Sequence, residues 1–403
     1  MNSVEHAGVN HTHGKLEFMA SSLTSSNTAD VIIIGGGLIG SSIAFRLAQA
    51  RLKVLVFDRG EPGAEASAAA AGMIAPQGES TDLGDFFALC SASRALYPGF
   101  VLEIEDLTGE GVGYHQEGTL LVAVDEEESS ELERIYQAQT RIGQRLERLS
   151  PETVHQRVAG LSAEIRSGLG IPEDHWVDNG LLTRAVIEAA KRLDVTFLAH
   201  APVIGLGVRN GRVESLEART GATTAPSRFS AGHFVLAAGC WSGKLLAPLG
   251  ISLPMLPCRG QMMEFDSPRE LPLVVREGHH YLVPRASKRI VVGTTAEYVG
   301  YEKGVTGDGL FSILQGALRI APLLKGCSFR RAWAGLRPDT ADHLPILGYG
   351  DLGNLVFATG HFRNGILLAP ITAQLISELL ITGTASHQID AYHPARFDRI
   401  TRP

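Results

Sequence analysis

The chain contains few cysteines and no long apolar run. Its 403 residues include four cysteines, which are scattered and form no C-x-x-C pair: Cys90, Cys240, Cys258 and Cys327. This usage fits a reduced compartment and predicts neither a metal site nor a disulfide framework. No apolar run approaches the roughly 20 residues that span a bilayer, so we expect no membrane span.

Basic residues are not in excess either. The chain has 36 Lys and Arg against 43 Asp and Glu, which gives a formal net charge of −7. This balance argues against a general affinity for nucleic acid or for an anionic membrane surface. With 44% hydrophobic and 20% charged residues and a mean hydropathy of +0.07, the composition is that of an ordinary globular protein, and the length suits two cores.

The N-terminal segment lacks the apolar core of a secretory signal. Residues 1–28 are rich in Ser, Thr, Asn and His, so we predict a disordered tail, in which Met19 is an alternative start. His11 and His13 fit such a tail better than they fit a metal site. Since we find no export signal, we expect a cytoplasmic location.

A strand–turn–helix pattern follows this segment. Residues 31–34 form a short apolar run of β-branched residues, which predicts a buried strand, and residues 41–50 predict a helix. Between them lie three glycines in G-x-G-x-x-G spacing. The first glycine permits a tight turn, the second allows close approach of a pyrophosphate, and the third allows the helix to pack closely on the strand. These glycines are Gly35, Gly37 and Gly40.

An acidic residue completes the pattern. Residues 53–57 predict a second strand, which ends at Asp58, where a carboxylate can accept hydrogen bonds from ribose hydroxyls. The N-terminus of the intervening helix offers free N–H groups and a positive dipole to phosphates. A lone glycine motif is a weak signal in a chain with 45 glycines. Strand, glycines, helix, strand and acid in this order predict a bound dinucleotide.

Three residues farther along are candidates for binding a small carboxylate. Arg337 lies in AGLRP, where we expect Pro338 to end the regular structure, and Arg363 lies in the turn between a strand at 354–358 and a helix at 366–380. An arginine fork suits a carboxylate, and a tyrosine hydroxyl adds a directed hydrogen bond. Tyr281 could supply this hydroxyl from the strand HYLVPR. Taken singly, these arginines are more often surface residues, and a lone Tyr281 is more often a packing residue.

The histidines and the other common catalytic patterns give no further candidates for catalysis. His279, His280 and His361 are each more often structural than catalytic, and no Ser–His–Asp, zinc or paired-carboxylate pattern stands out. The segment at 125–148 predicts a charged surface helix, and residues 256–296 predict short strands of an antiparallel sheet. Nucleotide-type βα units therefore lie at both ends of the chain, with a different architecture between them.

Four segments resemble the FAD-dependent D-amino-acid-oxidase (DAO) superfamily: VIIIGGGLIG with VFD, SAAAAGMIAP, HYLVPR with RIVVGTT, and AGLRPDTADHLPILG with GHFRNGILLAP. The resemblance runs from about residue 29 to about residue 384 and is strongest to the glycine oxidases of thiamine biosynthesis (ThiO type). It implies an α/β fold: a discontinuous Rossmann-like (GR2-type) FAD-binding domain with an inserted antiparallel-sheet substrate domain.

The resemblance also implies domain limits. We expect the FAD-binding domain at 29–107, 152–250 and 333–388, and the substrate-binding domain at 108–151 and 251–332. Residues 389–403 would form a C-terminal tail. Some relatives bind FAD through a cysteine, but no cysteine of this chain matches that attachment, so we expect non-covalent FAD.

Site residues follow from the same resemblance. Arg337 falls on the arginine that pairs with the substrate carboxylate, Tyr281 on its tyrosine helper, and Arg363 on a second active-site arginine. The positions matching FAD contacts are Gly35, Gly37, Leu38, Ile39, Gly40, Asp58, Arg59, Ala66, Ser67, Ala71, Gly72, Met73, Val203, His361, Phe362, Arg363, Asn364, Gly365, Ile366 and Leu367.

Two of these positions depart from the family pattern. Asp58 stands where Glu is usual, and although shorter it still accepts both ribose hydrogen bonds. Ala66 replaces a hydroxyl residue, which costs one hydrogen bond to the cofactor, about 1 kcal/mol.

The implied activity is oxidation of glycine, with small amines and D-amino acids, by hydride transfer to flavin N5. The products would be an imine, which hydrolyses to glyoxylate and ammonia, and hydrogen peroxide formed from molecular oxygen. The imine would serve the thiazole moiety of thiamine, and family members are often homotetramers. Three alternatives stay open: a D-amino-acid or sarcosine oxidase or dehydrogenase, a non-enzymatic flavoprotein, and a nicotinamide dehydrogenase.

Overall fold

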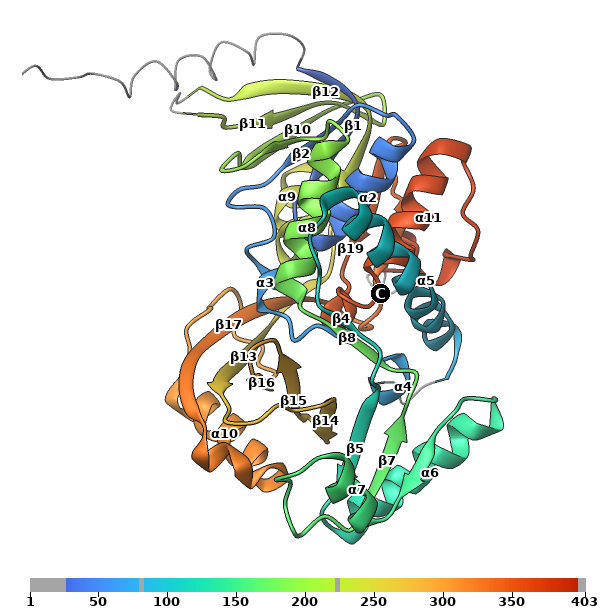
Figure 1. Ribbon diagram of the computed structural model, residues 1–403. Coiled ribbons are helices and arrows are strands. Elements are labelled where there is room, and N and C mark those ends of the chain that lie inside the picture. The colour runs from blue at the N-terminus through green and yellow to red at the C-terminus, as the bar shows by residue number, and fades with distance from the viewer. Residues whose placement is uncertain (1–26, 80–82, 222–224, 398–403) are drawn as a thin grey trace, which may run out of the picture.

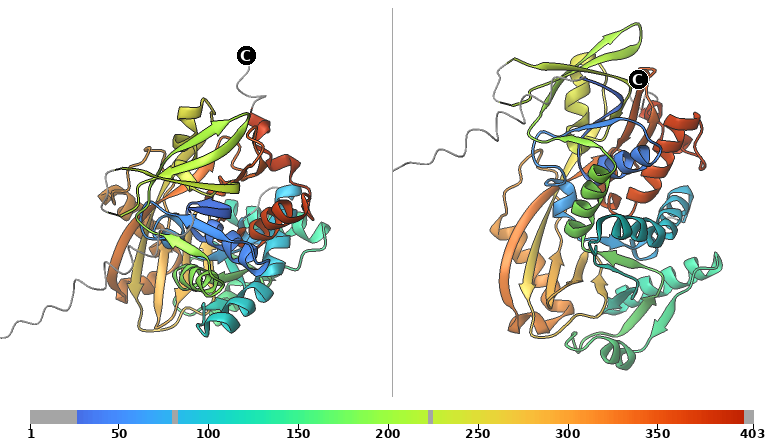
Figure 2. Two further views of the ribbon diagram at one scale, coloured as in Figure 1. Left: turned by 90° about the horizontal axis from the view of Figure 1, so that it is seen from above. Right: turned by 45° about the horizontal axis from the view of Figure 1, so that its top comes forward.

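The computed structural model describes residues 27–79, 83–221 and 225–397. Most of the predicted N-terminal tail therefore lies outside the described residues. Two large sheets dominate the structure, one above the other, and the view in Figure 1 and those in Figure 2 agree on this arrangement. A small three-stranded sheet is formed by β3 (Met73–Ile74), β8 (His175–Val177) and β4 (Tyr114–His115).

The upper sheet contains the predicted parallel unit. Its parallel strands, in spatial order, are β9 (Thr196–Leu198), β2 (Val54–Phe57), β1 (Thr28–Ile34), β12 (Ser227–Leu236) and β19 (Leu355–Thr359). β18 (Ile346–Tyr349) closes one edge in antiparallel orientation. The start of β12 also pairs with a hairpin formed by β10 (Val203–Arg209) and β11 (Arg212–Ala218). Strands from both ends of the chain thus belong to one sheet, in which β12 lies between β1 and β19.

Both faces of the upper sheet are covered. Ile33 packs into a core with helices on one face, while Ile32 packs into a second core on the hairpin side. Because alternate residues of a strand point to opposite faces, burial of both faces explains the continuous apolar run at 31–34. The covering helices are α2 (Leu38–Gln49), α5 (Asp85–Thr108), α8 (Asn179–Arg192) and α11 (Ala369–Thr382).

The helix limits differ from the sequence predictions in three places. α2 begins at Leu38 rather than at residue 41, since the glycine motif itself forms the first turn. The helix predicted at 366–380 is α11, which begins at Ala369 after a separate short turn, η5 (Phe362–Asn364). The predicted helix at 125–148 is α6 (Glu126–Arg141); Gly143 follows it with a φ of 82°, and the chain then enters an edge strand.

The lower sheet contains the predicted strands of residues 256–296. In spatial order its strands are β17 (Ser328–Thr340), β13 (Met255–Asp266), β16 (Arg289–Gly293), β15 (His280–Arg285), β14 (Val274–Glu277), β5 (Thr119–Ala123), β7 (Ser167–Ile171) and β6 (Glu147–Leu149). All neighbours are antiparallel except β14 and β5, so the expected antiparallel sheet has one parallel pair. Helices α10 (Gly307–Ile320) and α7 (Pro151–Arg157) pack against it.

Two strands of the lower sheet lie in ranges that we expect in the FAD-binding domain. β7 lies within the range 152–250 that we expected in the FAD-binding domain, yet it pairs in the lower sheet. β17 likewise keeps to the lower sheet as far as Thr340, beyond the expected limit at 333. Pro338 does not end this strand, because β17 is an edge strand, where a missing N–H is tolerated.

The expected C-terminal tail is partly packed. Tyr392 and Phe397 are buried against the rest of the chain, and the Arg396 guanidinium forms an ion pair with Asp342. Only residues 398–403 of this segment lie outside the described residues. The segment therefore belongs to the folded body at least as far as residue 397.

We predict that Asn354 stabilises the upper sheet. Its buried side chain accepts from the Val213 N–H at 2.8 Å and donates to the Val213 and Gly232 carbonyls at 2.9 and 3.2 Å. Asn354→Ala leaves these backbone groups without partners and should lower the free energy of unfolding by about 3 kcal/mol. Thermal unfolding measures this loss. The control is Asn27→Ala, which removes a single exposed hydrogen bond, and equal shifts in both variants would contradict the prediction.

Candidate active site

A cavity of about 1140 Å³ is lined by residues of both large sheets. Every predicted FAD-contacting residue lines it except Gly40, Asn364 and Leu367. Arg337 and Tyr281 line the same cavity. The fold therefore brings together the residues that the sequence placed at the two ends and in the middle of the chain.

The three glycines of the motif have different surroundings. Gly35 has a φ of 109°, which side chains rarely adopt, and a Cβ there would overlap the Ala237 carbonyl. A Cβ on Gly40 would overlap the Gly35 carbonyl, so Gly40 allows α2 to lie close on β1 and does not face the cavity. Gly37 lines the cavity and leaves its wall open. The surroundings of Gly35 and Gly40 are those of a tight turn and of close helix–strand packing, while the approach of a pyrophosphate at Gly37 stays a prediction.

Polar groups converge at this glycine turn. The Asp58 carboxylate accepts hydrogen bonds from the N–H groups of Gly36 and Gly60, each at 2.9 Å, and burial raises the pKa of Asp58 above its ordinary value. Its oxygens keep lone pairs for further donors. The Leu38 N–H at the start of α2 donates to Ser67 Oγ at 2.9 Å. The turn therefore carries a carboxylate and a helix N-terminus within one wall of the cavity.

Arg337 is held in place by the chain that faces it. Its Nη1 donates to the Thr295 carbonyl at 3.0 Å, and its Nη2 donates to Thr294 Oγ1 at 2.8 Å. Tyr281 is 7% exposed, its hydroxyl donates to Met262 Sδ at 3.3 Å, and burial raises its pKa, so the phenol is neutral. A fixed guanidinium and a neutral hydroxyl are the donors that a small carboxylate needs.

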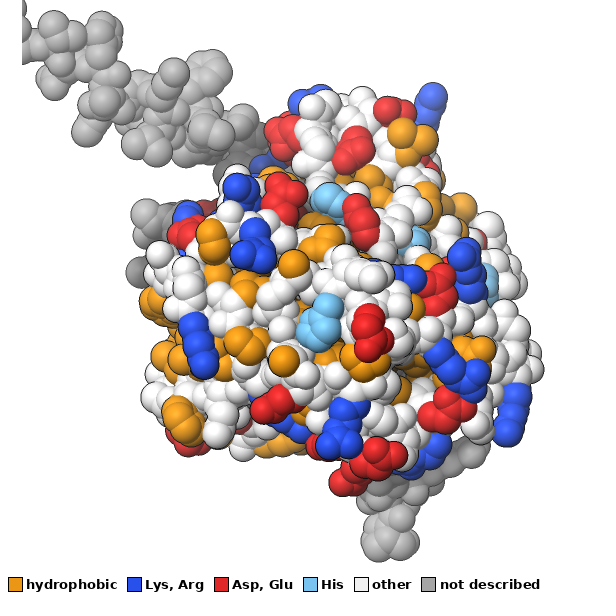
Figure 3. All heavy atoms as spheres, turned by 60° about the horizontal axis from the view of Figure 1, so that its bottom comes forward, with side chains coloured by type: hydrophobic (Ala, Val, Ile, Leu, Met, Phe, Trp, Pro, Cys, Tyr) orange, Lys and Arg blue, Asp and Glu red, His pale blue; other side chains and the backbone are white. Residues whose placement is uncertain are grey.

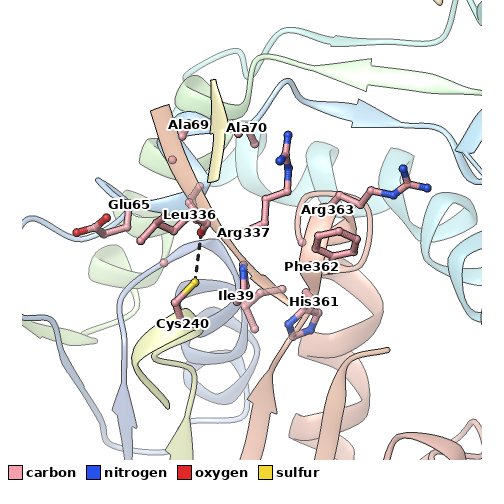
Figure 4. Close-up of a pocket in the computed structure, with 18 of the residues that line it drawn as sticks. Ile39, Glu65, Ala69, Ala70, Cys240, Leu336, Arg337, His361, Phe362 and Arg363 are labelled. Carbon is pink, nitrogen blue, oxygen red and sulfur yellow. Dashed lines mark hydrogen bonds between the residues drawn. The ribbon is translucent and has the colours of Figure 1, made fainter. Parts of the chain in front are cut away.

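Arg363 lines the same cavity, but its guanidinium has a different direction from that of Arg337 (Figure 4). The Nη2 of Arg363 donates to the Glu79 carbonyl at 3.0 Å. Arg276, which we did not single out from the sequence, also lines the cavity and donates to the Gly78 carbonyl at 2.6 Å. Arg276 lies opposite Tyr281 in the β14–β15 pair, and the sequence alone does not show this strand pairing, which places Arg276 at the cavity.

A second group missed by sequence reasoning lies near Arg59. The Arg59 guanidinium stacks on the Trp241 ring at 3.4 Å from the ring centre, and it contacts Glu65 at 2.5 Å. Lys303 reaches the same Glu65 carboxylate at 3.0 Å from the lower half of the molecule. The Arg59–Glu65 pair is local, but the contacts made by Trp241 and Lys303 join distant segments, so no local pattern predicts them.

His361 is a buried neutral histidine. It is 3% exposed, its Nε2 lies 3.0 Å from Thr372 Oγ1, and burial lowers its pKa to about 3. This environment agrees with the structural interpretation of the residue. Cys240 also lines the cavity, donates to the Leu336 carbonyl at 3.5 Å (Figure 4), and has a pKa raised to about 12 by burial.

Comparison with known proteins identifies the family. The model of the DAO family, described as FAD dependent oxidoreductase, matches residues 30–379. The chain belongs to this family. The predicted fold class and FAD as the cofactor are thereby confirmed.

Named relatives of this DAO-family chain include two kinds of protein. A bifunctional ThiO/ThiG protein of Trichormus variabilis is 38% identical over 92% of this chain and 56% of its own length. The chain therefore spans about half the length of such relatives. Glycine oxidase of Geobacillus kaustophilus is 32% identical over 87% of this chain and 92% of its own length. A crystal structure of glycine oxidase from that organism has a TM-score of 0.86 at 30% identity and covers 92% of this chain and 99% of its own.

The cavity fits the FAD of the DAO family. The glycine turn leaves room where a Cβ would fill the wall, the α2 N-terminus suits a pyrophosphate, and Asp58 suits a ribose.

Across residues 27–79, 83–221 and 225–397, no helix is long and apolar enough to cross a membrane, and no group of three His, Cys, Asp or Glu could hold a metal ion. On the face shown in Figure 3, basic and acidic side chains are interspersed.

We predict that Gly260 reserves space for Arg337. A Cβ on Gly260 would overlap both Nη atoms, and a guanidinium at the end of a flexible side chain will move rather than disrupt the sheet. Gly260→Ala should therefore weaken binding of a small carboxylate such as acetate about tenfold, while FAD stays bound. Titration followed by the flavin absorption spectrum measures this. Gly304→Ala, where an added Cβ meets nothing within 4 Å, is the control, and equal affinities would refute the prediction.

We also predict a pH dependence from Asp174. This buried carboxylate accepts from the N–H groups of Gln77 and Gly78 at the start of α4 (Pro76–Glu79), and burial raises its pKa to about 7. Because the folded pKa exceeds the unfolded value of about 4, its contribution to stability is full below about pH 4 and is lost as the pH rises through about 7. The melting temperature of Asp174→Asn should fall less than that of the wild type between about pH 5 and pH 8.

The matched control for this experiment is Asp194→Asn, which changes an exposed carboxylate. This variant should follow the wild type over the same pH range. If Asp174→Asn also followed the wild type, Asp174 would not be the titrating group.

Proposed function

We propose that the chain is an FAD-dependent glycine oxidase, which converts glycine to its imine and passes the electrons to molecular oxygen. The observation that carries this proposal is the pair Arg337 and Tyr281, which line one cavity together with the dinucleotide-binding turn. The similarity to glycine oxidases over most of the chain supports it.

In this proposal the protein binds and orients the substrate. Arg337 pairs with the substrate carboxylate as a fork, and the neutral Tyr281 hydroxyl exchanges its weak sulfur acceptor, Met262, for the carboxylate and so donates a further hydrogen bond. Thr294 and the Thr295 carbonyl fix the plane of the guanidinium and so limit the directions from which the carboxylate can approach. Arg363 serves as a second active-site arginine, close to the Glu79 backbone.

The remaining chemistry depends on the position of the substrate relative to FAD and on the exclusion of water from the surface where they meet. When bound, FAD supplies the two-electron acceptor for the substrate C–H bond. The buried faces of Tyr281 and Met262 exclude water from that region, and the substrate amine reacts in its neutral form. No side-chain base is assigned, since fixing the reacting atoms in contact supplies several kcal/mol.

The finer predictions are part of the same proposal. They are non-covalent FAD held at the matched positions, two domains, a cytoplasmic location and a homotetramer. The product imine hydrolyses to glyoxylate and ammonia or serves the thiazole moiety of thiamine, and oxygen becomes hydrogen peroxide. The ThiO/ThiG names of the longer relatives support the thiamine role.

Anaerobic addition of glycine to the purified holoenzyme tests the substrate. We expect the oxidised-flavin band to bleach with glycine faster than with sarcosine, D-alanine or D-proline. Discrimination of a single methyl is worth only about 1–3 kcal/mol, so some overlap among these substrates is expected. If sarcosine or a D-amino acid bleached the band and glycine left it unchanged, glycine would not be the substrate and the amine that bleached the band would take its place.

Arg337→Ala tests the proposed carboxylate clamp. The variant should keep its flavin and lose about a thousandfold in kcat/KM, because a desolvated charge pair loses one partner. Steady-state oxygen consumption measures this. The control is Arg330→Ala on the same strand, whose half-exposed side chain pairs with Asp266 outside the cavity. Unchanged kinetics in Arg337→Ala would remove this arginine from the site.

A further inference from the structure

The carbonyl groups of residues 67–72, here called the alanine segment, are almost all bound by donors from outside it. Asn179 Nδ2 donates to the Ser67 and Ala68 carbonyls at 2.8 and 3.2 Å. The remaining donors are Trp333 Nε1 to Ala69 at 3.1 Å, Arg285 Nη2 to Ala71 at 2.6 Å, and the Val177 N–H to Gly72 at 2.8 Å. The surrounding structure thus pulls these carbonyls away from the cavity.

The N–H groups of this segment have the opposite orientation. In a trans peptide the C=O and the following N–H point in opposite directions, so an outward Ala71 carbonyl turns the Gly72 N–H inward. Residues Ala70, Ala71 and Gly72 line the cavity, and within the described part of the chain the N–H groups of Ala71 and Gly72 donate no hydrogen bond. Backbone donors in such a place call for an acceptor. The segment therefore presents a row of free donors to whatever fills the cavity.

Arg285 controls the central peptide of this row. Its side chain is 8% exposed, and besides the Ala71 carbonyl it binds Asn179 Oδ1 and the Pro284 carbonyl, each at 2.9 Å. The nearest carboxylate, Asp178, lies 3.8 Å from Nε, so most of the guanidinium is used to hold neutral groups. Burial lowers the pKa of Arg285 to about 10, which leaves it charged near neutral pH.

The position of the segment shows which end of the dinucleotide it meets. Ala71 and Met73 pack in one cluster with Tyr281 and Met262, at the end of the cavity where the substrate clamp lies. The glycine turn and Asp58 supply the polar groups of the nucleotide end. Arg285 lies on the same strand as Tyr281, β15, and on the same face of it, because residues an even number of positions apart share a face.

We propose that Arg285 is a positioning residue that fixes the alanine segment so that its free N–H groups donate to the flavin ring of FAD. This inference rests on the proposed function only for the identity of the ring that is bound. It joins the strand that carries Tyr281 to the wall that holds the cofactor, so that substrate and flavin are aligned by one strand. Loss of Arg285 frees the Ala71–Gly72 peptide to rotate.

The test compares FAD with ADP as probes of the full-length apoprotein. ADP engages the glycine turn and Asp58 but lacks the flavin. Arg285→Met should weaken FAD binding at least about tenfold while ADP affinity stays within about twofold, since one charge-assisted hydrogen bond and the donors that it orients are lost. Arg285→Lys should weaken FAD binding by a smaller factor, because an ammonium cannot hold two acceptors in the planar geometry of a fork. Isothermal titration measures both affinities.

Arg289→Met is the matched control, since Arg289 begins the next strand and pairs with Glu264 without contact to the alanine segment. FAD affinity equal to wild type in Arg285→Met, or a parallel loss of FAD and ADP, would overturn the proposal. If Arg285→Met does not fold, the FAD-to-ADP ratio of Arg285→Lys decides in the same way. Failure of the wild type to bind FAD would instead refute the flavoprotein assignment itself.

Discussion

The close approach of bare backbone to the cavity is the constraint on which the rest of this structure depends. Part of the wall of the upper half consists of residues with no side chain or with a single methyl group, among them Gly37, Ala70 and Gly72. In the lower half, Gly260 and Gly293 instead make room for side chains, since an added Cβ would overlap the Arg337 guanidinium or the Tyr281 ring. Where the wall lacks long side chains, peptide groups can contact a large ligand directly, and the two sheets hold these stretches of backbone in place.

Local patterns account for the part of the fold that was predictable. The βαβ unit with its acid, at 28–58, could be predicted because neighbouring residues in one continuous stretch form its turn, its helix–strand packing and its carboxylate. Strand pairing between distant segments carries no such signature. The pairing of β5 with β14, which is the one parallel step in the lower sheet, could not be read from either segment alone. Pro338 suggested the end of a strand because the sequence does not show which strands lie at an edge.

The candidate site divides in the same way. The glycines and Asp58 could be recognised by spacing, and Arg337, Tyr281 and Arg363 by resemblance. Their partners could not, since Thr294 meets Arg337 across 43 positions and Arg285 meets Ala71 across 214. A side chain that orients a functional group has to be near that group in space but not in sequence. Its position therefore leaves no motif that could be recognised before the fold is known.

The threading of the chain through the upper sheet has a consequence for biosynthesis. β19 pairs with β12, and α11 packs on α2, so the sheet and its helical layer are incomplete until residues 355–382 have left the ribosome. Until then, the edge of β12 and the apolar face of α2 are exposed to solvent, and such surfaces favour aggregation. These surfaces stay uncovered for longer than in a protein whose nucleotide-binding unit is continuous, and the upper sheet can close only after residues 355–382 have been made.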